Sequence, residues 1–406
     1  MTCDLTKYMP PMMTGERLLQ ALTALPAYDP AIQNQSSSKR LVALSALYDI
    51  YIPSAMTTEI YSKLYLALMR SLRKKGSREA VSQKYENLKA ICQQAYESII
   101  GGADSFTIIG ASGIGKSSAI SRALGLMNGQ GVIKIEHPYA KILPCVVVQC
   151  PFDASVKGLL LEILRKVDER LSTGFYQNAL KVRATVDMLI GSVSQVALQH
   201  IGLLVVDEIQ NVVSSKNGKS LISMLTQLIN NSGISICMVG TPESTVFFSQ
   251  AMQLARRSLG LQYEKLTYDE HFCDFCHTLW GYQYVQKRTA ITPMMVEWLY
   301  AHSSGIVSVV VSLIHDAQEI AILNGTEELN QATLNEAYWK RLAMLHGYVH
   351  TEPIKIPAPV RKMTVTLKQM ASEAVSIGAM AERARLEKLD IVTLLKQHMP
   401  VEEVRL

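Results

Sequence analysis

Residues 105–117 read SFTIIGASGIGKS, and this stretch decides the fold. Its apolar, β-branched opening predicts a buried strand, and the G-x4-G-K-S motif at 110–117 predicts a glycine-rich turn that leads into a helix. The backbone amides of such a turn, together with the helix N-terminus, surround phosphate groups. The residues expected to form this phosphate site are Gly110, Ala111, Ser112, Gly113, Ile114, Gly115, Lys116, Ser117 and Ser118.

A second stretch, LLVVDE at 203–208, supplies the acidic groups that a bound nucleoside triphosphate requires. We expect Lys116 to contact the β- and γ-phosphates of ATP, and Ser117 and Asp207 to hold Mg²⁺ at the carboxyl end of a parallel strand. Glu208 would polarise the attacking water, and the site would then hydrolyse ATP. The alternative is an ordinary strand–turn–helix with a chance lysine. The helix-compatible sequence that follows the motif and the paired acids disfavour that alternative.

Bulk composition sets wide limits on the function. A chain of 406 residues with 48% apolar and 18% charged residues has room for two or three globular domains. Its formal charge of +5 permits nucleic-acid binding without demanding it. The seven cysteines are scattered and odd in number, which favours a reducing compartment over a disulfide framework. We find neither a signal-peptide pattern nor an apolar run long enough to span a bilayer, so we expect a cytoplasmic protein with no membrane partner.

Strands and helices alternate in the middle of the chain, which predicts an α/β fold with a parallel sheet between two layers of helices. We expect strands at 105–109, 143–149, 201–207 and 234–240, with helices at 116–127, 155–171, 178–199 and 218–231. A helix at 85–99 and a loop between Pro138 and Pro144 are also expected. The predicted domains are a helical N-terminal extension for partner interaction (1–100), an ATPase core (101–260), a small helical lid (261–350), and a proline-rich linker with a C-terminal helical tail (351–406).

Two further features complete the expected nucleotide site. The segment ISICMVGTPE at 234–243 predicts a buried strand that is inserted between the two motifs and ends at Thr241, a candidate γ-phosphate sensor; the alternative is a simple turn. Arg256 and Arg257 follow one helix later. They suit an arginine finger that reaches the nucleotide of a neighbouring subunit, and a solvated helix face is the alternative.

A pair of cysteines, Cys273-x2-Cys276, lies between two histidines and invites a zinc interpretation. We reject it because no second pair of Cys or His residues follows at ligand spacing. Phe272, Phe275 and Leu279 recur with helical spacing through the same segment. The cysteines are therefore expected to pack a helix.

An ordered set of segments resembles the TnsC/TniB family of AAA+ transposition regulators, which is related more distantly to the transposition protein MuB. The matching segments are YDIYIP (48–53), FTIIGASGIGKSSAI (106–120), KGLLLEIL (157–164), GLLVVDEIQNV (202–212), NNSGISICMVGTPE (230–243), LARR (254–257) and LWGYQ (279–283). Two departures stand out. The stretch SSGIVSVVVSLIHDA at 303–317 lacks the sensor arginine that AAA+ lids often carry. The long interval between Lys116 and Asp207 implies an insertion or elongated helices around 150–200.

This resemblance implies an AAA+ P-loop ATPase that uses ATP and Mg²⁺ as a switch. Such proteins assemble on double-stranded DNA as homo-oligomeric rings or helical filaments, with a hexamer or heptamer per turn. They link a TniQ- or TnsD-type target selector, sometimes CRISPR-guided, to a TnsA/TnsB-type transposase, and hydrolysis releases or resets the assembly. Within this family the protein would be bacterial, cytoplasmic and nucleoid-associated.

Contact with DNA would be non-specific and made through phosphates. The candidates are Lys216 and Lys219, in the loop after the acidic motif, and a basic run that includes Arg73 and Lys74; a solvated surface is the alternative for each. The C-terminal helix suits a tethered element that docks on the transposase. It would otherwise pack back on its own domain.

Two competing functions remain at this stage. A replication initiator or helicase loader uses the same core, but it commonly appends a winged-helix domain, and the segment after residue 350 is too short and too proline-interrupted for one. A scaffold with a purely structural ATP site has no need of a water-activating acid. Glu208 therefore argues against the scaffold, while the missing lid arginine argues for it.

Overall fold

The computed structural model describes residues 4–127, 131–136, 140–245, 248 and 260–347. The linker and helical tail expected at 351–406 lie outside the described residues, as do Arg256 and Arg257. All statements below concern the described part of the chain.

A six-stranded sheet forms the centre of the ATPase core, with the strand order β2-β3-β4-β5-β1-β6. Five of these strands are parallel, and β2 alone pairs antiparallel, with β3. The strand β5 lies between β1, which carries the glycine-rich motif, and β4, which ends in Asp207; this confirms the predicted inserted strand. The strands are β1 (Ser105–Gly110), β2 (Ile133–Ile135), β3 (Ala140–Gln149), β4 (Ile201–Asp207), β5 (Ser235–Gly240) and β6 (Leu261–Tyr263).

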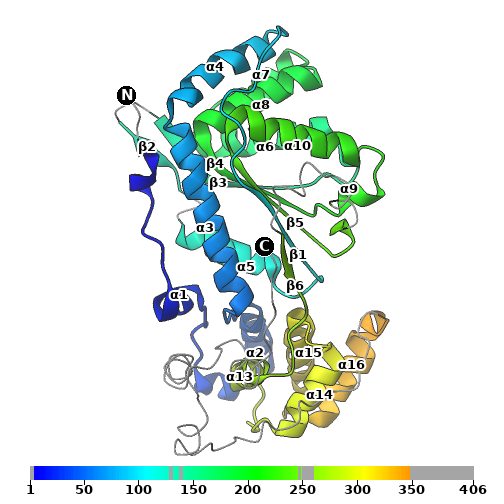
Figure 1. Ribbon diagram of the computed structural model, residues 1–406. Helices are drawn as coiled ribbons and strands as arrows, with labels where there is room; N and C mark the ends of the chain where they lie inside the picture. Colours follow the sequence, from blue (N-terminus) through cyan, green and yellow to red (C-terminus); the bar gives the residue numbers. More distant parts are fainter. Residues whose placement is uncertain (1–3, 128–130, 137–139, 246–247, 249–259, 348–406) are drawn as a thin grey trace, which may run out of the picture. The chain divides into compact units, whose positions relative to one another are not determined.

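Helices cover both faces of the sheet, as the fold class predicts (Figure 1). Because successive side chains of a strand point to opposite faces of the sheet, each strand contributes residues to two hydrophobic cores. In β4, Leu203 and Val205 face one core, and Leu204 and Val206 face the other. The first core includes α1 (Gly15–Leu22), α3 (Ala55–Lys75) and α5 (Lys116–Leu126). The second includes α6 (Val156–Leu171), α8 (Val186–His200) and α10 (Gly218–Ser232), with the short helices α7 (Phe175–Lys181) and α9 (Asn211–Ser214) beside them.

Three predicted boundaries are wrong. The helix expected at 178–199 is two helices, because the chain turns after α7 with Arg183 at a left-handed φ of 52° before α8 begins. The helix expected at 85–99 is instead α4 (Arg78–Ile91), and the left-handed Gln93 (φ 57°) follows its end. The expected loop before Pro144 is part of β3. A proline fits there because β2 pairs only with residues 140–142 and leaves that side of β3 without a partner strand.

Two strands of the sheet were not predicted from the sequence. The expectation of extra structure between Lys116 and Asp207 is confirmed. The edge strands β2 and β6 have three residues each, too few for a recognisable alternation of apolar and polar residues. The long interval between Lys116 and Asp207 contains β2, β3 and three helices, α6, α7 and α8, which accounts for the extra length.

The lid has its own core, built by α13 (Glu270–Gly281), α14 (Pro293–Ser303), α15 (Val307–Asn324) and α16 (Gln331–Arg341). Phe272, Phe275, Cys276 and Leu279 are buried in it, which confirms that this segment packs as a helix. The helix α15 is long and apolar enough to cross a membrane, but more than half of it is buried, as in the core helix of a globular domain.

The N-terminal residues divide their contacts between these cores. The helix α2 (Ser37–Leu44) and the following 3-10 turn (Ser45–Asp49) place Leu44, Leu47 and Ile50 in the lid core, whereas α3 packs on the sheet. Arg40 anchors this segment. It is fully buried, and its guanidinium donates hydrogen bonds of 2.5 and 2.6 Å to the two carboxylate oxygens of Glu327.

Candidate nucleotide site

The glycine-rich turn has the geometry that its sequence predicts. Gly113 (φ 80°) and Gly115 (φ 96°) take left-handed conformations that strain any other residue, and Gly115 is the N-cap of α5. The Lys116 ammonium donates to the carbonyl oxygens of Gly110 (2.6 Å) and Ala111 (2.8 Å). These bonds place the ammonium over the turn, where the phosphates of a nucleotide would lie.

Electrostatics around Lys116 involve three carboxylates. Burial lowers the pKa of Lys116, while the nearby charges of Asp207, Glu208 and Glu243 raise it. The ammonium therefore lies among three carboxylates at the phosphate end of the cavity. Phosphate groups bound beside it would add further negative charge and favour its protonated form.

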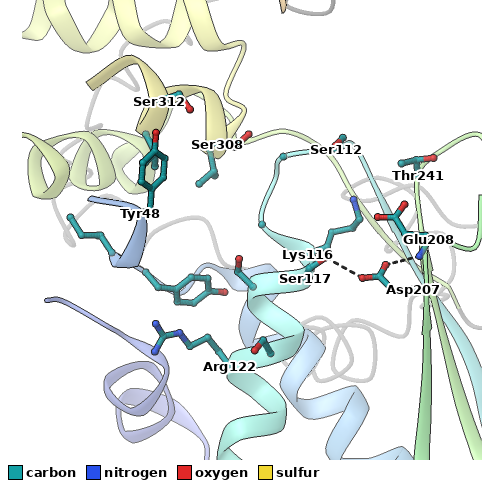
Figure 2. A pocket seen from close by; sticks show the side chains of 18 of the residues that line it. Tyr48, Ser112, Lys116, Ser117, Arg122, Asp207, Glu208, Thr241, Ser308 and Ser312 are labelled. Carbon is teal, nitrogen blue, oxygen red and sulfur yellow. Dashed lines mark hydrogen bonds between the residues drawn. The ribbon is translucent and has the colours of Figure 1, made fainter. Parts of the chain in front are cut away.

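The predicted magnesium ligands contact each other directly. The Ser117 hydroxyl donates to Oδ2 of Asp207 over 3.2 Å, and the other carboxylate oxygen accepts the amide of Glu208 at 2.8 Å. One hydroxyl and one carboxylate, at a parallel-sheet edge beside a phosphate site, are hard oxygen donors of the type that Mg²⁺ prefers. The residues therefore fit this ion (Figure 2).

Glu208 lies at a turn, with a left-handed φ of 57° and an exposed side chain. Its carboxylate accepts a hydrogen bond from the amide nitrogen of Gln210. The amide oxygen of Gln210 is buried without a hydrogen-bond partner in the described structure, and it lies so close to Gly240 that a Cβ there would be 3.0 Å away. Sequence reasoning missed Gln210. Its only signal was its position two residues after the acid.

Thr241 follows β5 directly and lines the same cavity as Lys116 and Glu208. A hydrogen bond from Thr241 lowers the pKa of Glu243, and the charge of Lys116 lowers it further. Glu243 is therefore near enough to Lys116 for the two charges to interact, although it is not one of the residues that line the cavity.

The opposite side of the cavity comes from two distant segments, 48–51 and 307–312. The cavity has a volume of about 750 Å³. Tyr48, Ser308 and Ser312 lie across it from Lys116 and Asp207 (Figure 2). No nucleotide contact was predicted for these segments from the sequence, although YDIYIP at 48–53 is one of the segments that resemble the TnsC/TniB family.

The first turn of α15 is bonded to the glycine-rich turn. The Ser308 amide donates to the Gly113 carbonyl at 3.0 Å, and a Cβ on Gly113 would lie 2.3 Å from the Ser308 hydroxyl oxygen. The helix carries serines at 308 and 312 and no arginine, in agreement with the departure noted in the sequence. A different cation lines the cavity, Arg122 of α5, whose guanidinium lies 5.4 Å from the centre of the Tyr51 ring.

The predicted phosphate residues divide into two groups. Ser112, Gly113, Gly115, Lys116, Ser117 and Ser118 line the cavity together with Asp207, Glu208 and Thr241. Gly110 and Ala111 instead accept hydrogen bonds from Lys116, and Ile114 is buried.

The basic residues predicted to contact DNA lie at opposite edges of the sheet. Lys216 and Lys219 are exposed in and after the loop between α9 and α10, beyond the carboxyl end of β4. The ammonium of Lys74 instead donates to the carbonyls of residues 100, 101 and 102, directly before β1 begins. Lys74 therefore tethers the chain within the fold, whereas its neighbour Arg73 is exposed at that edge.

Strand order, glycine-rich turn and adjacent acids together define a P-loop ATPase of the AAA+ class. A family model described as Bacterial TniB protein matches residues 79–266, from α4 to just beyond β6. The match covers just under half of the chain and agrees with the resemblance seen in the sequence. A solved structure of the Aeropyrum pernix Orc1 protein in complex with DNA is similar with a TM-score of 0.43 and 16% identity, over 80% of this chain and 78% of that one. Comparison with curated proteins gives no match.

Proposed function

We propose that this ATPase regulates DNA transposition: with ATP bound it assembles on duplex DNA and links a target-selection factor to a transposase. The match of residues 79–266 to the TniB family model supports the role in transposition. The observation that carries the proposed mechanism is the joined arrangement of Lys116, Ser117, Asp207 and Glu208 around one cavity.

Each residue of the phosphate side has a separate task in this mechanism. Lys116 binds the β- and γ-phosphates, and Ser117 and Asp207 hold Mg²⁺, which would neutralise phosphate charge when bound. Glu208 accepts a hydrogen bond from the attacking water and orients it. Thr241 donates to the γ-phosphate from the end of β5.

The far wall of the cavity holds the nucleoside. Tyr48, Tyr51, Val307 and Val311 offer rings and methyl groups to the base, since apolar walls with a few polar groups are typical of small-molecule sites. Because Val307 and Val311 belong to α15 of the lid, a bound nucleotide contacts the core and the lid at once. Arg256 and Arg257 of a neighbouring copy would supply positive charge to the γ-phosphate, which α15 does not.

Contact with DNA is assigned first to Lys216 and Lys219, which are exposed on the same edge of the sheet as the ATP site. Arg73 is at the other edge and would meet a different part of the assembly. Residues 351–406 would bind the partner proteins, a TniQ- or TnsD-type selector or a TnsA/TnsB-type transposase. The protein would act in the bacterial cytoplasm as a ring or filament of six or seven copies per turn.

Imaging of the purified chain by negative-stain electron microscopy tests this proposal. With duplex DNA and a non-hydrolysable ATP analogue we expect rings or filaments, and with ADP we expect their loss. The variant Glu208→Gln should hold the assembly with ATP itself, because it binds the nucleotide but does not turn it over. Monomers under every nucleotide and DNA condition would overturn the proposal.

A further inference from the structure

Phe152 is the most exposed aromatic side chain in the described part of the chain, with 90% of its surface open to solvent. It lies in the turn between β3 and α6, at the carboxyl edge of the sheet. Isolated exposed apolar residues are common on proteins. Two further observations separate this one from the ordinary case: the rigidity of its turn and the charge around it.

The turn is fixed by a second loop. Asn211 donates to the carbonyl of Cys150 (3.0 Å), and Ser215 (2.7 Å) and Asn217 (3.1 Å) both donate to the carbonyl of Asp153. We call residues 150–157 and 211–219 together the two-loop tip. Hydrogen bonds on either side of the phenyl ring hold its backbone, so the side chain is kept in solvent by the fold.

The two-loop tip is basic around the ring. It contains three lysines, Lys157, Lys216 and Lys219, all exposed, against one acid, Asp153. Lysine is depleted in protein–protein interfaces. The two-loop tip contains one other exposed apolar side chain, Val213, and its excess of lysine suits a polyanion better than a protein surface.

We propose that the two-loop tip binds duplex DNA with the Phe152 ring inserted as a wedge between base steps in the minor groove, while Lys216 and Lys219 contact flanking phosphates. Apolar side chains enter the minor groove in this way in proteins that bend DNA. The inference rests on the proposed function and deepens it, because it adds an apolar contact to DNA binding that otherwise depends on lysine–phosphate contacts.

The test uses the full chain with a non-hydrolysable ATP analogue and a fluorescent duplex, with affinity measured by anisotropy at several salt concentrations. Phe152→Ala should weaken binding roughly fivefold or more, because the apolar surface of the ring is no longer removed from water on binding. Its salt dependence should equal that of the wild type. Lys216→Ala should instead reduce the slope of log K against log salt by about 1, because one phosphate contact is lost.

Two variants serve as controls. Phe152→Leu keeps an apolar side chain and should bind close to the wild-type level. Tyr85→Ala removes another exposed aromatic ring, on α4, and should change nothing.

The outcomes separate this inference from the proposed function. If Phe152→Ala binds DNA as the wild type does while Lys216→Ala binds weakly, the phenyl contact is refuted and the proposed function stands. If Phe152→Ala changes self-association without DNA, the ring belongs to an interface between copies and the inference is overturned. If the wild type itself binds no duplex, the inference and the proposed function fail together.

Discussion

The two walls of the nucleotide cavity differ in kind. The phosphate wall consists of charged, hydroxyl and backbone groups, several of which are hydrogen-bonded to one another. Its residues are Ser112, Gly113, Gly115, Lys116, Ser117, Ser118, Asp207, Glu208, Gln210, Gly240 and Thr241. The lid wall, residues 48–51 and 307–312, presents rings, methyl groups and hydroxyls together with one carboxylate, Asp49. In the proposed mechanism the phosphates and Mg²⁺ meet the first wall, and the nucleoside meets the second.

The difference between the two walls suggests a way in which nucleotide binding acts as a switch. The phosphate wall is continuous with the sheet and is held by strands buried on both faces. The lid wall depends on elements outside the sheet, and one hydrogen bond, from Ser308 to Gly113, joins its helix to the glycine-rich turn. A ligand that touches both walls stabilises that junction, since it binds the joined arrangement in preference to a separated one.

The largest expected effect on nucleotide binding is on the phosphate wall. Lys116→Ala removes the ammonium and should weaken ATP binding roughly a hundredfold, because bonds between charged groups contribute about 1.5–3 kcal/mol each. Titration with a fluorescent ATP analogue measures this loss. The matched control is Lys219→Ala, an exposed lysine outside the cavity, which should bind ATP normally. Equal affinity of Lys116→Ala and the wild type would contradict the assignment.

Glu208→Gln should separate binding from turnover within the same wall. Loss of a general base lowers a rate roughly a hundredfold or more, whereas the amide keeps the size of the side chain. We expect unchanged ATP affinity and strongly reduced phosphate release. Glu169→Gln, on α6 and away from the cavity, is the control. Hydrolysis at the wild-type rate in Glu208→Gln would show that another group orients the water.

The substitution Arg40→Ala tests whether the ion pair between Arg40 and Glu327 stabilises the segment that carries the lid wall. This side chain is 1% exposed and its partner Glu327 is 13% exposed. Removing one member of such a pair leaves a buried charge, so Arg40→Ala should lower the free energy of unfolding by about 3–5 kcal/mol. Denaturant unfolding measures this change. Arg165→Ala, which breaks ion pairs on the surface of α6, should have little effect.

Acidic pH should weaken the ion pair between Arg40 and Glu327. The hydrogen bond from Arg40 lowers the pKa of Glu327 below its ordinary value of 4.5. A carboxylate with a lowered pKa in the folded state stabilises the fold above its unfolded pKa, and this contribution is lost as the pH falls through the folded value. The free energy of unfolding should therefore fall less steeply on acidification in Glu327→Gln than in the wild type. Identical slopes for the two proteins would refute this linkage.

The smallest expected effect is on the lid wall itself. Val311→Ala removes two methylene equivalents from the wall and should raise the KM for ATP about fivefold, with kcat unchanged, because apolar burial stabilises the ground state and the transition state equally. Steady-state hydrolysis assays measure both constants. Val81→Ala, exposed on α4, is the control. A change in kcat would show that the two walls are not separate in function.

Local sequence determined most of the phosphate wall. The glycines at 113 and 115 require left-handed backbone, and an apolar strand that ends in Asp207 and Glu208 must place both acids at the carboxyl edge of a parallel sheet. Each motif places its polar residues at the carboxyl end of its own strand, and in a parallel sheet those ends lie at the same edge. For this reason Lys116, Ser117, Asp207 and Thr241 were predicted and line one cavity.

Tertiary structure alone decided the rest. Tyr48 and Ser308 lie 260 positions apart in the chain and meet only because α2 and its turn pack into the lid core. The contacts of Lys74 with residues 100–102 were equally hidden, since its sequence context is that of a basic surface run. Periodicity and motif spacing describe neighbours along the chain. Packing between elements decides which distant side chains share a cavity and which charged groups are already paired. No local sequence pattern predicts either outcome.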